Sequence, residues 1–167
     1  MEKNQNKKQP QAFMKKAAQI GLFGGLFWGA VWYFLHIFSF SNVGPNYFLM
    51  PFALGDWKKD VWGNVSGIAV MGILSIVIAM LYGALFKKFQ GVIPGIIYGL
   101  FWWAVLFLGI GSLSPVLKNA LEFQKETLIT TICIFILYGV FIAYSVSFEA
   151  SEEKLTGTAK ETNYSNK

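Results

Sequence analysis

The chain has 167 residues, of which 54% are hydrophobic and 14% are charged. Soluble domains usually contain about 45–50% apolar and about 25% charged residues, so this composition excludes an ordinary soluble protein. The formal net charge is +5, from 14 basic and 9 acidic residues, and every one of the 14 is a lysine because the sequence contains no arginine. Without arginine to make paired contacts with bases and phosphates, nucleic acid is not expected as a partner.

Four runs contain no Asp, Glu, Lys or Arg: residues 17–40, 61–86, 91–117 and 127–148. A helix rises about 1.5 Å per residue, so roughly 20 residues cross a hydrocarbon core about 30 Å thick. Each run is long enough to span. Hydrocarbon offers no partner to an exposed backbone amide, and the runs are therefore expected to be helical. The sequence predicts an all-α integral membrane four-helix bundle.

The transmembrane domain is expected to cover residues 17–149, with helices at about 17–40, 61–86, 91–112 and 127–148. The segments on either side of it, residues 1–16 and 150–167, are rich in polar side chains. Such segments cannot bury enough apolar surface to order themselves. Both are expected to be disordered.

Lysines are distributed unevenly around the predicted helices. Ten lie before the first helix, between the second and third, or after the fourth, and four lie in the two alternate loops. The positive-inside rule assigns the lysine-rich side to the cytoplasm. Both termini are therefore expected to be cytoplasmic, with the two longer loops outside.

The two outer loops carry signals for short interfacial helices. The first contains the apolar stretch 47–54, expected in the headgroup layer, followed by Asp56 as the predicted N-cap of the second helix. In the second, Ser114 and Pro115 resemble an N-cap and first-turn pair that opens a short helix ending near Phe123. That helix is expected to rest on the outer leaflet.

Glycines recur at four-residue spacing in the first and third helices: Gly21, Gly25, Gly29, and Gly91, Gly95, Gly99. The second and fourth helices offer small residues at the same spacing: Ser75, Ala79, Gly83, and Gly139, Ala143, Ser147. Residues four apart share one helix face, so each stripe predicts a close helix–helix contact. The contact is either within the bundle, the favoured interpretation, or with another copy in a homo-oligomer.

One segment recurs along the chain. Residues 25–31 match residues 99–105 at six of seven positions, in two helices that run in the same direction. This indicates either two parallel hairpins related by duplication or a coincidence in an aromatic, glycine-rich chain. A second match, between residues 81–83 and 137–139, does not fall at equivalent points of its two helices.

Charged groups that mark ion or proton pathways are absent from all four runs. His36 is the single histidine and Cys133 the single cysteine, and neither has a metal-binding or catalytic partner nearby in sequence. A His36 site would need outer acids such as Asp56, Asp60 or Glu122. No catalytic, metal or cofactor site is predicted, and the chain is not expected to be an enzyme.

Hydroxyl side chains leave one alternative open. A small transporter or channel subunit could use a polar seam of hydroxyls inside the bundle: Tyr82, Tyr98, Thr130, Thr131 and Tyr138. This interpretation requires those side chains to converge on one cavity.

The first outer loop contains Asp56, Trp57, Lys58 and Lys59 in succession. Tryptophan anchors at the membrane interface and lysine contacts headgroups, which explains the cluster without a partner. Loops also carry function more often than cores do. The cluster is therefore the candidate for contact with a protein partner on the outer face.

This loop, residues 51–60, together with residues 130–133 and 138–149, resembles the YqhR family of small conserved membrane proteins from Bacillus-type bacteria. The resemblance covers about residues 17–149. It implies a location in the bacterial plasma membrane and transfers no functional residues to this chain.

These observations predict a multi-pass plasma membrane protein in contact with the lipid bilayer. A non-enzymatic accessory or scaffold role is favoured, with a membrane protein partner or a homo-oligomer. The alternative is a small transporter or channel subunit.

Overall fold

The computed structural model describes residues 2–51, 55, 57, 60–86, 91–110 and 123–165. Within these ranges the chain forms helices and loops and no β-strand. Four helical stretches are long and apolar enough to cross a membrane: Phe13–Ile37, Val61–Leu85, Val92–Gly109 and Lys125–Glu152. The predicted all-α fold with four spanning helices is confirmed.

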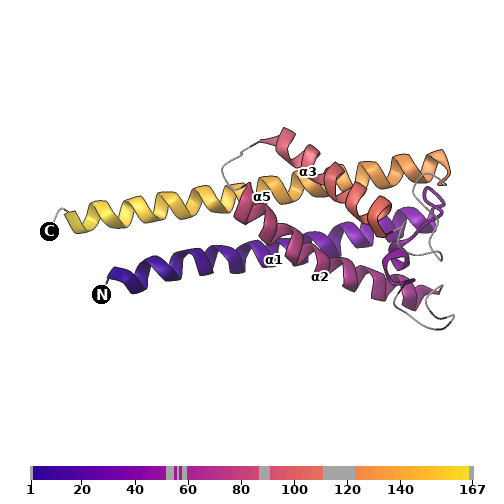
Figure 1. The fold of residues 1–167 in the computed structure, drawn as a ribbon, viewed down its shortest axis with the longest axis horizontal. Helices are drawn as coiled ribbons and strands as arrows, with labels where there is room; N and C mark the ends of the chain where they lie inside the picture. Colours follow the sequence, from indigo (N-terminus) through magenta and orange to yellow (C-terminus); the bar gives the residue numbers. More distant parts are fainter. Residues whose placement is uncertain are drawn as a thin grey trace.

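Helices α1 (Glu2–Ile37) and α5 (Lys125–Ser165) are much longer than the other two. Both project beyond α2 and α3 at the end where the termini lie, called here the terminal end (Figure 1). The structure is therefore helical over residues 2–16 and 150–165, where we expected disorder. Lys, Gln, Glu and Ala favour helix, and a segment that continues an existing helix has no nucleation cost.

Helix α2 (Val61–Leu85) and helix α3 (Val92–Ala104) are the shorter pair. The N-cap of α2 is Asp60 and not the predicted Asp56, and the Asp60 side chain makes no capping hydrogen bond. The wider π-helical segment η3 (Val105–Ile110) continues the course of α3. Gly91 precedes α3 with a φ of 138°, a conformation that favours glycine.

The first helix pair, α1 and α2, packs along the predicted glycine stripe. A side chain at Gly21 would collide with the Ser75 carbonyl and the Ala79 side chain, and one at Gly25 would collide with Ser75. Gly29 also faces α2. Since these positions have no side chain, the two backbones approach within van der Waals contact.

The second pair, α3 and α5, packs in the same way. A side chain at Gly95 would meet the Gly139 carbonyl and the Ala143 side chain, and one at Gly99 would meet the Phe135 carbonyl. Gly91, the remaining residue of this stripe, lies before the helix, and its nearest neighbour is Pro94 of its own chain segment. Five of the six predicted glycines therefore face another helix of the same chain.

The two hairpins share one contact register. A Cβ at Gly21 would meet the Ser75 carbonyl and the Ala79 Cβ of α2, and a Cβ at Gly95 would meet the Gly139 carbonyl and the Ala143 Cβ of α5. Gly21 therefore corresponds to Gly95, and Ser75 and Ala79 correspond to Gly139 and Ala143. In this register Tyr82 corresponds to Val146 and not to Tyr138. The sequence match of residues 81–83 with 137–139 is therefore out of register, whereas the match of residues 25–31 with 99–105 is in register.

Two apolar clusters fill the interior. One, toward the terminal end, is built around Phe13, Tyr82 and Ile142. The other, at the opposite or loop end, groups Trp32 with Phe107. Both clusters take side chains from both hairpins, and so they hold the hairpins together.

The loop end is closed by the connection between α1 and α2. Its short 3-10 helix η1 (Pro45–Phe48) packs on α2 at Gly67. Tyr47 and Phe48 are only 3% and 2% exposed, so the protein itself covers this part of the stretch that we predict to lie in the headgroup layer. The Tyr47 ring stacks on Phe107, and the Phe48 ring is tilted against it. The second predicted interfacial helix, from Ser114, lies outside the described residues.

Candidate functional site

The hydroxyl side chains of the interior bond to neighbouring helices. Ser75 Oγ donates a hydrogen bond of 2.5 Å to the Gly21 carbonyl and lies 2.6 Å from Tyr138 Oη. Because the single Ser75 proton is used on Gly21, Tyr138 is the donor in the second contact. The Tyr98 hydroxyl donates to the Ile78 carbonyl over 2.6 Å. These bonds join α1 to α2, α2 to α5, and α3 to α2.

The threonines of α5 are also engaged. Thr131 Oγ1 lies 2.9 Å from the Thr127 carbonyl and accepts from Trp103 Nε1 at 3.2 Å. Thr130 Oγ1 donates to the Phe40 carbonyl at 3.0 Å. Together with the tyrosines they form separate contacts spread along the bundle. Tyr138 lines one space between the described helices and Tyr98 lines another.

His36 closes the end of α1. Its Nδ1 lies 2.7 Å from the Ser41 carbonyl oxygen. Because that oxygen can only accept, Nδ1 carries the hydrogen and donates it. Ser39 nearby has a φ of 62°, a left-handed conformation that ends helices. The described part of the chain contains no group of three His, Cys, Asp or Glu residues able to hold a metal ion. His36 thus orders the turn after α1.

The loop end is ordered by side chains from both hairpins. The Asn42 amide donates to Thr127 Oγ1 at 2.9 Å, and Asn42 Nδ2 donates to Gln124 Oε1 at 2.5 Å. Burial raises the pKa of Tyr47, so this phenol stays neutral. The connection between α1 and α2 is therefore anchored on α5.

The predicted outer-face cluster is described only in part. Trp57 lies in the connection before α2 and is 46% exposed, as a contact surface requires. Asp56, Lys58 and Lys59 lie outside the described residues. A partner-binding role for the cluster stays a prediction.

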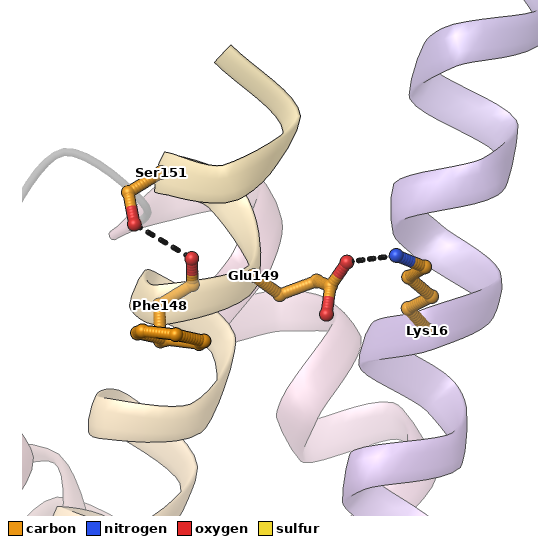
Figure 2. Close-up of polar contacts among 4 residues, drawn as sticks. All are labelled: Lys16, Phe148, Glu149 and Ser151. Atoms are coloured by element: carbon orange, nitrogen blue, oxygen red, sulfur yellow. Dashed lines mark hydrogen bonds and ion pairs between the residues drawn. The ribbon is translucent and has the colours of Figure 1, made fainter. Parts of the chain in front are cut away.

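One ion pair joins the two longest helices. Lys16 Nζ of α1 donates to Glu149 Oε1 of α5, and Figure 2 shows Glu149 reaching across from α5. Two residues after Glu149, Ser151 Oγ donates to the Phe148 carbonyl at 2.7 Å. The Lys16 side chain is 56% exposed, so solvent screens the pair and its contribution to stability is small. The ion pair marks the level at which α1 and α5 contact each other at the terminal end.

Two spaces between the helices stand out among the described residues. A cavity of about 20 Å³ lies at the centre between Trp28, Ser75 and Tyr138, and it has room for about one water molecule. A much larger crevice of about 500 Å³ lies between α2 and α3. Its wall is apolar and includes Leu81, Leu85, Phe86, Ile93, Ile97 and Phe101.

Sequence reasoning missed the ion pair and the crevice. Lys16 and Glu149 lie at the inner edges of predicted tails, and the pattern alone does not indicate that they meet. Crevice residues such as Leu81 and Ile97 are ordinary apolar residues of a span. These residues differ from other apolar residues only because the distance between α2 and α3 leaves a space beside them.

The fold and its interior define a membrane protein of four spanning helices, arranged as two glycine-packed hairpins. The chain belongs to the family described as conserved membrane protein YqhR, which matches residues 1–161. It is also 41% identical over 151 residues to the Bacillus subtilis (strain 168) protein named "Uncharacterized protein YqhR", covering 90% of this chain and 85% of that protein. No solved structure matches it.

Proposed function

We propose that this chain is a non-enzymatic accessory or scaffold protein of the bacterial plasma membrane, with both termini in the cytoplasm. The observation that carries the proposal is the use of the interior polar groups. Ser75, Tyr98, Tyr138 and Thr131 each bond to a backbone carbonyl or to another interior side chain. They serve helix assembly.

The transporter or channel alternative requires these hydroxyls to line one cavity. The central cavity of about 20 Å³ contains Tyr138, whereas Tyr98 lies on the α2–α3 crevice. No observation therefore favours a polar pathway over a scaffold.

The test is affinity purification of the tagged full chain in mild detergent after cross-linking in the membrane. A scaffold is expected to retain a partner protein or a second copy at a fixed ratio. A monomer with no partner, in both cross-linked and untreated membranes, would contradict the proposal.

The outer-face cluster gives the sharper version of this test. A variant with Trp57→Ala, Lys58→Gln and Lys59→Gln is expected to lose the cross-linked partner. The matched control is Trp62→Ala, since Trp62 is also exposed, at 74%, and begins α2. If both variants keep the partner, the cluster is not the contact surface.

A further inference from the structure

The shared register makes two interfaces between the hairpins equivalent. Since α1 corresponds to α3 and α2 to α5, the α1–α5 interface corresponds to the α3–α2 interface. A symmetric molecule would pack both alike. In this one α1 packs closely along α5, whereas the backbones of α2 and α3 stay apart.

Side-chain contacts at the terminal end explain why α1 and α5 pack closely. Phe13 of α1 is 5% exposed and shares the space over Gly83 of α2 with Val146 of α5, and Ala150 of α5 is 6% exposed. Lys16 and Glu149 add their ion pair at this level. Both helices continue past α2 and α3, so their contact has no counterpart on the other side (Figure 1).

The α2–α3 interface lacks those groups. Counting along the register, Lys16 and Glu149 correspond to Gln90 and Leu85, which cannot form an ion pair. The Tyr98 ring instead sits 5.0 Å from Tyr82 and 5.9 Å from Phe86, bridging the helices at the base of the gap. The crevice of about 500 Å³ is what remains open beyond these rings.

The crevice opens sideways within the spanning segments. Its rim residues Leu85, Ile93 and Ile97 are 66%, 72% and 62% exposed. Both helices are long and apolar enough to cross a membrane, so this opening faces hydrocarbon. The occupant must therefore be apolar and must enter from the bilayer.

The size of the crevice indicates the kind of occupant. Its volume of about 500 Å³ lies within the range of roughly 300–1,000 Å³ typical of small-ligand sites. A slender hydrocarbon chain fits this space, and the test below distinguishes it from a second copy of the chain. In the sequence, Lys87 and Lys88 follow Phe86, and their charge complements a phospholipid phosphate.

We propose that the crevice between α2 and α3 binds an acyl chain of a membrane phospholipid. The site follows from the broken symmetry of the two hairpins, and it does not depend on the scaffold role. Trp102 lines it, while its counterpart Trp28 lines the central cavity instead. This pair provides a reporter and an internal control.

The experiment uses the full chain in vesicles of phosphatidylglycerol and phosphatidylethanolamine. Phosphatidylglycerol with a dibrominated acyl chain is added in increasing proportion, because bromine quenches tryptophan fluorescence on contact. Two variants keep either Trp102 or Trp28, with every other tryptophan changed to Phe. Quenching of Trp102 is expected to saturate at a low proportion of brominated lipid, and quenching of Trp28 is expected to be weak. Equal quenching, or quenching of Trp102 that follows the bulk proportion throughout, would overturn the proposal.

Filling the crevice gives the second arm. Leu81→Phe with Ile97→Phe is expected to remove most of the Trp102 quenching. The matched control, Ile73→Phe with Ile129→Phe, adds the same bulk at lipid-facing sites that are 63% and 61% exposed and should leave quenching unchanged. Far-UV circular dichroism verifies that both variants are folded. Quenching of Trp102 that survives the filled crevice, or that falls as protein concentration in the vesicles rises, would refute acyl-chain binding; the latter result would indicate a second copy as the occupant.

Discussion

Ser75 lies where three helices meet. Its hydroxyl donates to Gly21 of α1 and accepts from Tyr138 of α5, while its own backbone belongs to α2. Ser75 is 2% exposed and Tyr138 is 6% exposed, so neither group has bulk water as a substitute partner. A buried polar group left without a partner costs more than the bond itself contributes.

Ser75→Ala is therefore expected to lower the free energy of unfolding by roughly 1–2 kcal/mol, because it leaves the Tyr138 hydroxyl unsatisfied. Adding Tyr138→Phe should recover part of this loss, since both partners are then apolar. The measurement is a double-mutant cycle by denaturant titration in detergent micelles. Tyr144→Phe, at a residue of α5 that is 67% exposed, is the control and should have no effect. Additive losses would show that the two hydroxyls are not coupled.

Glycine positions differ sharply in the space around them. A Cβ at Gly99 would meet the Phe135 carbonyl and the Ile136 Cα, whereas a Cβ at Gly109 would meet nothing within 4 Å. The Phe135 carbonyl that faces Gly99 is part of the backbone, so it cannot rotate away as a side chain could. The two residues therefore test the same substitution in a closed and an open environment.

Gly99→Ala is expected to destabilise the protein by about 1–3 kcal/mol, as overpacking does elsewhere. Gly109→Ala should be neutral or slightly stabilising, because alanine restricts the unfolded chain more than glycine does. Thermal unfolding in detergent compares the two. Equal effects would mean that α3 is not held against α5 at Gly99.

At the scale of elements, η1 depends on one residue of α2. A Cβ at Gly67 would collide with the Pro45 carbonyl, so η1 can sit on α2 only where that side chain is missing. The position of η1 in turn brings Tyr47 and Phe48 into the cluster with Trp32.

Gly67→Ala is expected to lift η1 from α2 and to make the connection between α1 and α2 more sensitive to protease. Limited proteolysis of protein in vesicles would detect this as faster cleavage between α1 and α2. Val65→Ala is the control, at a residue of the same helix that is 47% exposed. An unchanged cleavage rate for Gly67→Ala would contradict the packing described for η1.

Hydropathy and glycine spacing predict the elements well, because span length and close contact depend on local sequence. The inward face of each helix is less predictable, since every face of a membrane helix is apolar. Ile78 is 4% exposed and its neighbour Val77 is 53% exposed, although both are aliphatic and β-branched. The sequence leaves open whether the hydroxyl side chains lie inside. The structure buries Tyr82, Tyr98, Thr131 and Tyr138, and the bonds that such groups make to individual carbonyls depend on side-chain geometry that spacing does not contain. The crevice depends on how far apart two helices lie, which no single helix encodes.

At the scale of the molecule, both termini lie at one end, beyond α2 and α3 (Figure 1). An even number of crossings requires this arrangement, and the lysine distribution predicts which side of the membrane it is. We expect a fluorescent protein fused to either terminus to mature and an alkaline phosphatase fused there to be inactive. A phosphatase fused within the first long connection should be active. Active phosphatase at a terminus would reverse the proposed orientation.

The aromatic cluster at the loop end links the surface to the interior. Trp32 is fully buried, and its ring lies 5.7 Å from Phe48 of η1 and 5.8 Å from Phe107 of η3. The connection that carries Trp57 is thus joined through Phe48 to the apolar cluster that both hairpins share at the loop end. A molecule that pulled on this connection would disturb Trp32, so the emission of that one indole would report an event at the end of the bundle opposite the termini.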